Sequence, residues 1–213
     1  QRSLSGSFSQ PLGNLERAEV AIDFGVGELS LDSLPASSSD LVQGEFEHQG
    51  VADGVNQRLT VDRGVGQLEM ASPASGARFL GDFRQNWQVR LTPRIPLGLT
   101  IKAGASRGQL NLTNLRVSRL GLDVGASKVT LNMPRVVQGT LDAQIKAGAA
   151  DLTIIIPQGI AVQIKPDDGL SSLQIDEKRF PRTQDSYTSP DYAQASDRLR
   201  IRISSGLARI EVK

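Results

Sequence analysis

The residues that could carry chemistry in this sequence are few and widely separated. His48 is the single histidine and lies in the alternating run Glu45-Phe46-Glu47-His48-Gln49. Alternation of this kind is typical of a half-buried strand, and we expect His48 to face solvent. One histidine cannot form a multi-histidine metal site, and there is no cysteine to supply thiolate ligands or a thiolate nucleophile. We therefore predict no metal centre and no triad-type catalysis.

Acidic residues offer a second kind of chemistry. Asp167-Asp168-Gly169 has the oxygen donors that Ca²⁺ prefers, but a turn between strands is the favoured interpretation. Polysaccharide-cleaving β-helix enzymes need clustered carboxylates in a groove. Here Asp23, Asp62 and Asp123 recur at one position of a repeat and alternate with lysines in other copies. We predict no catalytic residue and no cofactor, and keep a carbohydrate-binding or polysaccharide-cleaving protein as the alternative function.

The densest aromatic cluster is the candidate interaction patch. It consists of Phe79, Phe83 and Trp87, and several arginines lie near it in the sequence. Aromatic rings beside guanidinium groups can bind a glycan or a peptide. The structural alternative is that Trp87 belongs to one buried strand face and that the two phenylalanines cap an end of the fold. The patch is the surface on which we expect partner contact.

An internal repeat positions these residues. A ten-residue pattern starts at residues 22, 61, 101, 122, 145 and 203, so the basic unit is roughly 20 residues long. All copies have glycine at the fourth position: Gly25, Gly64, Gly104, Gly125, Gly148 and Gly206. Apolar and polar residues alternate on both sides of this glycine, which predicts a strand, a corner and a second strand in each unit. Glycine permits the positive φ or the close backbone approach that such a corner requires.

Units of this type bury their inner faces against their neighbours and stack into a solenoid. We therefore predict an all-β, β-helix-like solenoid of roughly 20-residue coils with very little helix. Stacked coils place Lys102, Asp123 and Lys146 in one outward column of alternating charge, which favours the register. We expect the run Arg198–Ile203 to form an exposed terminal coil whose arginines discourage edge-to-edge association.

We predict three parts within the chain. Residues 1–14 form a flexible lead-in or cap, residues 15–98 form irregular N-terminal coils, and residues 99–213 form regular C-terminal coils. A surface loop at about 176–197 interrupts the last part, because Pro, Ser, Asp and Tyr replace the alternation there.

Composition narrows the function classes. The 213 residues carry 24 Lys and Arg against 23 Asp and Glu, which gives a formal net charge of +1. This balance offers no general attraction to nucleic acid, and we predict no nucleic-acid partner. The apolar runs are too short to span a bilayer, so we predict no membrane insertion by this segment. The sequence leaves the oligomeric state open.

The sequence resembles the bacterial toast-rack domain over about residues 15–213. The resemblance rests on the glycine corners, the strand Leu41–Phe46, the stretch Trp87–Pro96 and the closing pattern from Asp191 to Gly206. It implies a right-handed, β-helix-like domain outside the cytoplasm, behind an upstream membrane or lipid anchor. Such domains occur in cell-wall-active antibiotics response proteins and in proteins assigned as adhesins. The implied role is a non-catalytic interaction or scaffold domain in envelope-stress sensing or adhesion, with a protein or cell-wall glycan partner.

Overall fold

The protein is an all-β chain, described here from a computed structural model that covers residues 3–49, 54–73, 84–167 and 172–213. The described residues contain no helix, and so none that could cross a membrane. The strands of the N-terminal half are β1 (Ser3–Pro11), β2 (Arg17–Ser33), β3 (Asp40–Gln49), β4 (Asn56–Asp62), β5 (Val65–Ala71), β6 (Arg84–Leu91) and β7 (Leu97–Asn111). The remaining strands are β8 (Val117–Val124), β9 (Lys128–Asn132), β10 (Thr140–Ala147), β11 (Asp151–Ile155), β12 (Ala161–Pro166), β13 (Leu173–Ile175), β14 (Arg182–Thr183), β15 (Ser186–Thr188), β16 (Arg198–Ser205) and β17 (Arg209–Val212).

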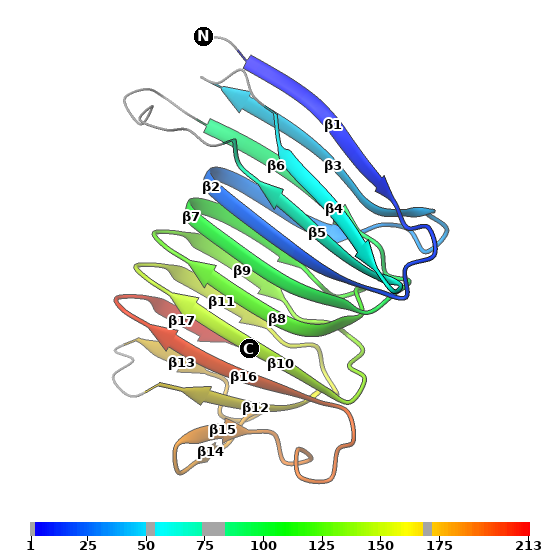
Figure 1. The fold of residues 1–213 in the computed structure, drawn as a ribbon. Coiled ribbons are helices and arrows are strands. Elements are labelled where there is room, and N and C mark those ends of the chain that lie inside the picture. Colours follow the sequence, from blue (N-terminus) through cyan, green and yellow to red (C-terminus); the bar gives the residue numbers. More distant parts are fainter. Residues whose placement is uncertain (1–2, 50–53, 74–83, 168–171) are drawn as a thin grey trace.

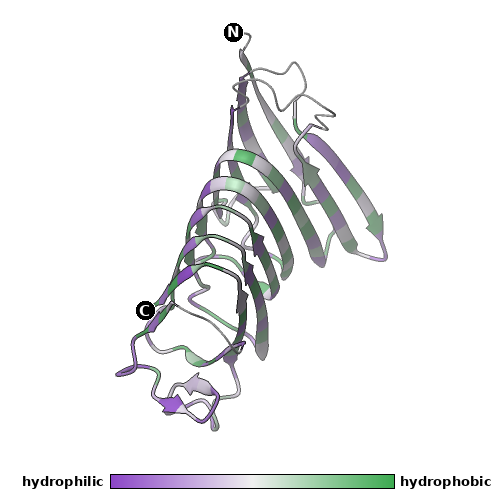
Figure 2. Cartoon of the chain, turned by 90° about the vertical axis from the view of Figure 1, so that its left-hand side faces the viewer, coloured by the Kyte–Doolittle hydropathy of each residue, from purple (hydrophilic) through white to green (hydrophobic). Residues whose placement is uncertain are grey.

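These strands form one sheet that bends along a line of corners into two facing walls (Figures 1 and 2). The first wall has the strand order β4-β5-β2-β7-β8-β10-β16-β12-β15-β14. The second wall has the order β1-β3-β6-β2-β7-β9-β11-β17-β13. Strands β2 and β7 are long enough to contribute to both walls, with the corner in the middle of each strand.

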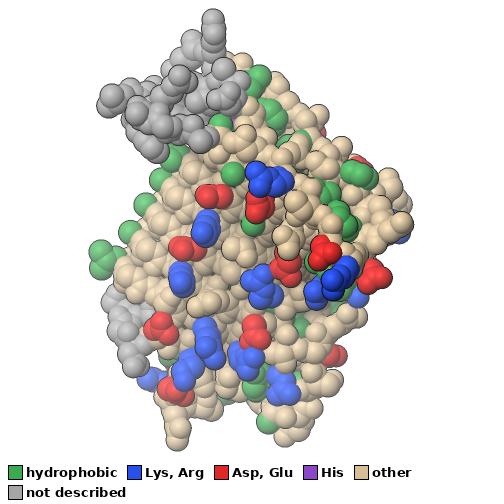
Figure 3. All heavy atoms as spheres, in the orientation of Figure 1, with side chains coloured by type: hydrophobic (Ala, Val, Ile, Leu, Met, Phe, Trp, Pro, Cys, Tyr) green, Lys and Arg blue, Asp and Glu red, His purple; other side chains and the backbone are tan. Residues whose placement is uncertain are grey.

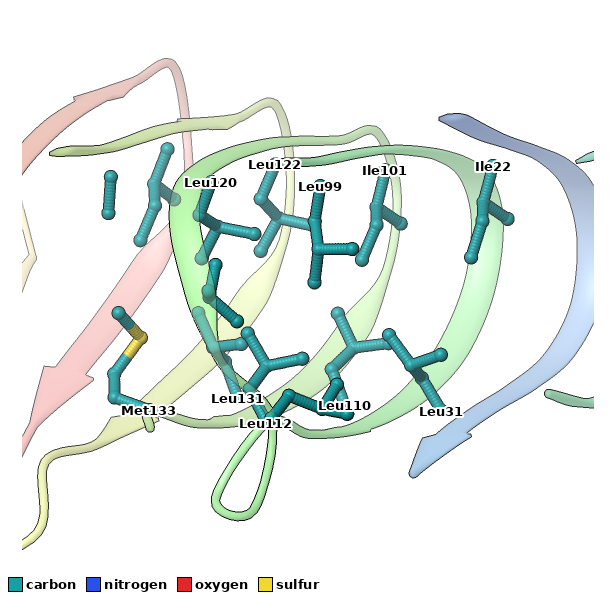
Figure 4. Packing of buried hydrophobic residues seen from close by; sticks show 14 of the residues in the cluster. Ile22, Leu31, Leu99, Ile101, Leu110, Leu112, Leu120, Leu122, Leu131 and Met133 are labelled. Carbon is teal, nitrogen blue, oxygen red and sulfur yellow. The ribbon is translucent and has the colours of Figure 1, made fainter. Parts of the chain in front are cut away.

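The core lies between the walls and is built from aligned aliphatic columns (Figure 4). On the first wall the parallel register aligns Ile22, Ile101, Leu122, Ile145 and Ile203. On the second wall it aligns Leu31, Leu110, Leu131, Ile154 and Val212. Every member of both columns is at most 2% exposed. Because burial of such a side chain contributes about 1.5–3 kcal/mol, the repeating inner face is the main source of stability.

The order of the coils in space differs from their order in the sequence. The C-terminal coil, which comprises β16 and β17, lies between the coil of β10 and β11 and the coil of β12 and β13. At the other end, β2 lies between β7 and the pair β5 and β6. The expectation that Arg198–Ile203 forms an exposed terminal coil is therefore wrong. Strand β16 pairs with β10 on one side and with β12 on the other, so its arginines lie on an interior strand of the sheet.

The N-terminal part mixes antiparallel pairs with the parallel stack. The predicted repeat copy that starts at residue 61 spans an antiparallel hairpin of β4 and β5 rather than a corner between walls. Strand β3 runs antiparallel to both β1 and β6. Within the predicted lead-in or cap of residues 1–14, β1 is paired with β3 from Ser3 to Pro11.

Candidate interaction surface

The corner that joins the two walls is a column of glycines. A Cβ atom on Gly104 would lie 2.7 Å from the carbonyl oxygen of Gly25, and one on Gly125 would lie 2.9 Å from that of Gly104. The corresponding separations are 3.4 Å for Gly148 above Gly125 and 3.5 Å for Gly206 above Gly148. Glycine is required at Gly104 and Gly125 because the backbone of the adjacent coil occupies the space that a side chain would need.

Gly64 does not belong to this column. It follows Arg63 in the turn between β4 and β5, and it has a φ of 78°. Glycine is required here because the tight hairpin places this residue in the left-handed region of backbone conformation. In the corner column, glycine is required because successive backbones stack closely. The identical position in the sequence pattern concealed this difference.

The predicted aromatic patch is not present as an exposed cluster among the described residues. Phe79 and Phe83 lie outside the described part of the chain. Trp87 is 0% exposed, and its indole N–H donates to Nε2 of His48 over 2.9 Å. The ring of Phe24 meets Trp87 edge-on, with centroids 5.3 Å apart. Trp87 is therefore a core residue of the second wall, as the structural alternative proposed.

His48 is also buried, contrary to the prediction that it faces solvent. Its exposed fraction is 0%, and it pairs across β3 and β6 with Gln85. Nε2 of His48 is thus the hydrogen-bond acceptor that satisfies the buried indole N–H. The alternation in β3 places His48 on the same face as Gly44 and Phe46, opposite Glu45 and Glu47. Burial of its polar ring is possible because Trp87 supplies a hydrogen-bond donor.

A further motif lies at the corner and could be mistaken for a nucleophile. Residues 104–108 read Gly-Ala-Ser-Arg-Gly, which fits the Gly-x-Ser-x-Gly pattern of serine hydrolases. That pattern needs a turn from a strand into a helix, whereas Ser106 lies inside β7. Ser106 is 7% exposed, and its hydroxyl is 3.1 Å from that of Ser127, which donates to the carbonyl of Gly104. These hydrogen bonds link the corners of two neighbouring coils.

The outer face of the first wall carries a regular pattern of opposite charges, and we call this face the charged wall (Figure 3). One column aligns Asp23 with Lys102, Lys102 with Asp123, and Asp123 with Lys146. The register therefore extends the predicted alternation by one more acidic residue. Opposite charges at neighbouring positions favour this register, and each pair contributes a few tenths of a kcal/mol, up to about 1 kcal/mol.

Two ion pairs strengthen a second column of the charged wall. Arg200 donates from Nε and from a terminal nitrogen to the two carboxylate oxygens of Asp142, at 2.5 and 3.0 Å. Arg119 donates to Glu19 over 2.7 Å, although Gly98 lies between them in the register. A Cβ atom on Gly98 would lie 2.1 Å from Oε2 of Glu19, so the missing side chain lets the carboxylate reach across.

The Asp142–Arg200 pair makes stability depend on pH. The guanidinium of Arg200 hydrogen-bonds the carboxylate and lowers the pKa of Asp142 below its usual value, while partial burial opposes this. A lowered carboxyl pKa stabilises the fold above the unfolded-state pKa, and this contribution disappears as the pH falls through the folded-state pKa.

We therefore expect Asp142→Asn to destabilise the protein by about 0.5 kcal/mol at neutral pH, because the half-exposed pair is screened by water. The difference from wild type should shrink as the pH falls below the ordinary aspartate pKa of about 3.9, because the carboxylate then becomes protonated in the folded state as well. Urea titrations at neutral and acidic pH measure both values, with Asp191→Asn, an exposed residue of the C-terminal loop outside the charged wall, as the control. A loss that is equal at both pH values would contradict this account of the pair.

A shallow hollow follows the corner on the second wall. Its larger part has a volume of about 650 Å³ and includes Glu28, Glu47, Arg84 and Arg107 in its lining. A second part of about 550 Å³ shares Ser106, Arg107 and Ala126 and continues past Lys128 and Asp151. Acidic and basic residues are mixed in the lining, and none of its described residues is aromatic.

The described residues contain no cluster of side chains that could bind a metal ion. No three His, Asp or Glu side chains among these residues lie close enough to hold an ion. Of the predicted turn at 167–169, only Asp167 is described, and its backbone N–H donates to the carbonyl of Ile203.

The charged wall was only partly visible in the sequence. The Asp23 column shares one position of the repeat and could be found by aligning copies. The second column could not be found in this way; it consists of Glu19, Arg119, Asp142 and Arg200. Its ion pairs depend on the interleaved C-terminal coil and on the missing side chain of Gly98. The sequence signal at this site is Gly98, a glycine near the start of β7 and outside the repeated corner position.

The family follows from comparison of the sequence with family models. Residues 2–155 match the model described as the N-terminal domain of toast_rack, DUF2154. The chain belongs to the toast-rack family. The stacked corners and the two walls are thus the toast-rack architecture in this protein. A comparison with curated proteins found no match.

One solved structure has the same fold over the whole chain. A proposed cell adhesion protein from Clostridium sporogenes ATCC 15579 superposes with a TM-score of 0.89 at 21% identity, covering 100% of this chain and 99% of the other. A proposed adhesin from Parabacteroides distasonis ATCC 8503 has a TM-score of 0.32 at 18% identity, covering 78% and 68%. The first match shows that the two chains share a fold.

Proposed function

We propose that this toast-rack domain is a non-catalytic interaction domain that binds a protein partner through its charged wall. The observation that carries the proposal is the bidentate Asp142–Arg200 pair in a column with Glu19 and Arg119. These groups stand on paired strands about 4.8 Å apart, so their positions are fixed before a partner arrives. Ordered charges of both signs select a complementary surface and oppose wrong partners.

The location outside the cytoplasm is part of the same proposal. The adhesion role proposed for the protein from Clostridium sporogenes supports display on a bacterial surface. Adhesion is the role we favour, and envelope-stress sensing remains the second use of the same surface. We also infer a right-handed winding of the coils, since parallel crossovers take that hand in nearly all sheets.

Catalysis finds little support among the described residues. Ser106 has a hydroxyl neighbour and a backbone neighbour instead of a base, and His48 is committed to Trp87. The mixed charges of the corner hollow do not form the isolated carboxylate pair that glycoside cleavage requires. A carbohydrate-active role is therefore the alternative against which the proposal is tested.

Surface display in a non-adherent bacterial host tests the proposal. We expect displaying cells to attach to fibronectin- or collagen-coated surfaces, and attachment should fall as salt rises because the contacts are exposed. A variant with Lys102→Gln, Arg119→Gln, Lys146→Gln and Arg200→Gln should lose most of this attachment. The matched control has Arg90→Gln, Arg107→Gln, Lys128→Gln and Arg209→Gln, which removes the same charge from the second wall.

Two results would count against the proposal. Equal attachment by both variants would show that the charged wall is not the contact surface. Release of reducing sugar ends from purified peptidoglycan sacculi by the wild-type chain would favour the carbohydrate-active alternative.

A further inference from the structure

The N-terminal end of the stack has an open strand edge. Strand β1 pairs with β3 along one side, and no described strand pairs with its other side. Counting outward from β2, the first wall has two more strands, β5 and β4, while the second has three, β6, β3 and β1. Strand β1 therefore extends one strand beyond the charged wall and is the outermost strand in Figure 1.

The opposite end of the stack is closed in a different way. Its outer strands β13, β14 and β15 are only two or three residues long. Phe180 is 1% exposed, and the neighbouring Arg179 donates to the carbonyls of Ile156 and Pro157. Short strands and a covering loop are common ways to prevent edge association. The two ends of the molecule are thus not equivalent.

Strand β1 has almost none of the features that protect an edge. No Lys, Arg, Asp or Glu occurs from Ser3 to Gln10, and Pro11 comes only at its end. The neighbouring edge strand β4 carries Arg58 and Asp62, both exposed. Charged side chains on an edge discourage pairing with another chain, and a long uncharged edge permits it.

The edge is also fixed in position before any partner arrives. The ring of Phe46 covers Gly6, where a Cβ atom would lie 2.7 Å from its Cζ. The ring of Phe8 covers Gly44 in the same way, with a Cβ separation of 2.0 Å. These reciprocal contacts, together with the register from Ser3 to Gln10, hold β1 to β3. Pre-organisation reduces the entropy that pairing must overcome.

The sequence of β1 is symmetric in type about Gly6. Residues 3–9 read Ser-Leu-Ser-Gly-Ser-Phe-Ser, with the odd-numbered serines exposed and the even-numbered residues turned inward. We propose that β1 pairs antiparallel with β1 of a second copy of this chain, centred on Gly6. This register places Ser3 opposite Ser9, Leu4 opposite Phe8, and Ser5 opposite Ser7.

Such a pairing is self-complementary in every position. Serine hydroxyls meet hydroxyls on the outer face, and the apolar side chains of Leu4 and Phe8 meet on the inner face. No like charges oppose one another, since β1 carries none. A two-fold axis midway between the two Gly6 residues relates the copies, which gives a closed dimer with one continuous second wall rather than an open fibre. This inference goes beyond the proposed adhesion role and does not depend on it.

Sedimentation of residues 1–213 across a wide range of concentrations tests the pairing. We expect wild type to reach twice the chain mass in the high-micromolar range. The double variant Ser5→Lys/Ser7→Lys places lysines opposite each other, so its dimer should be weaker by about tenfold or more. The control Ser30→Lys/Gln144→Lys adds the same charge on the interior strands β2 and β10 and should dimerise as wild type does.

A charge-swap mixture tests the register. Ser5→Glu/Ser7→Glu should also be monomeric alone, but mixing it with Ser5→Lys/Ser7→Lys should restore a dimer, because position 5 of one copy faces position 7 of the other. Unchanged Trp87 emission verifies that the variants are folded. Wild type that stays monomeric, lysine variants that still dimerise, or a mixture that fails to associate would each overturn the proposal.

Discussion

Deletion of residues 198–213 removes the coil of β16 and β17. We expect this deletion to abolish cooperative folding of the two coils that flank it, β10 with β11 and β12 with β13. The deleted coil supplies Leu199, Ile201, Ile203, Ile210 and Val212, which are each at most 1% exposed. Burial of each contributes about 1.5–3 kcal/mol, and together they match the net stability of about 5–15 kcal/mol of a typical domain. The deletion also leaves β10 and β12 with unpaired edges in the middle of the stack.

Circular dichroism during urea unfolding measures the effect of the deletion. A graded version uses Ile201→Ala, which should cost about 2–5 kcal/mol because the residue is fully buried between the walls. Arg202→Ala, on the exposed face of the same strand, should change stability by less than about 0.5 kcal/mol. A deletion variant that unfolds at the wild-type urea midpoint would show that the C-terminal coil is peripheral.

Gly104→Ala is expected to destabilise the protein by about 1–3 kcal/mol, the usual cost of overpacking. Its new Cβ atom would lie 2.7 Å from the carbonyl oxygen of Gly25, and backbone cannot move aside as a flexible side chain can. Gly206→Ala is the matched control in the same column. Its Cβ atom would lie 3.5 Å from the carbonyl oxygen of Gly148, an ordinary contact, so it should be neutral or slightly stabilising.

Urea midpoints of the two alanine variants decide between stacking and simple loss of flexibility as the reason for glycine. If both substitutions cost the same, the graded separation along the column has no energetic meaning. If Gly206→Ala is the more damaging of the two, the stacking order of the corners is wrong.

The alternation in the sequence was sufficient to predict an all-β fold and the inner columns. Ile101, Leu122 and Ile145 share one position of the repeat, and the structure aligns them in adjacent strands. This works because a period of two determines which face of a strand is buried. The same pattern says nothing about which strand is the neighbour, so the insertion of β16 between β10 and β12 was not predictable.

Local similarity in the sequence also predicts the wrong environment for particular residues. Gly64 shares the repeat pattern, but the antiparallel pairing of β4 with β5 makes its segment a hairpin. His48 looked like a solvent-facing residue because its type is polar, and only the position of Trp87 explains its burial. The charged wall depends on tertiary neighbours such as Glu19 and Arg119, which are 100 residues apart in the chain.

Hydrogen exchange of the backbone amides tests the central claim most directly, namely that the C-terminal coil lies inside the stack. We predict that amides of β16 exchange only through global unfolding, as slowly as those of β10, although they lie close to the end of the chain. Amides on the free side of β1 should exchange rapidly in dilute solution. Fast exchange throughout β16, at the rate of a fraying terminus, would contradict the interleaved coil and the charged wall built on it.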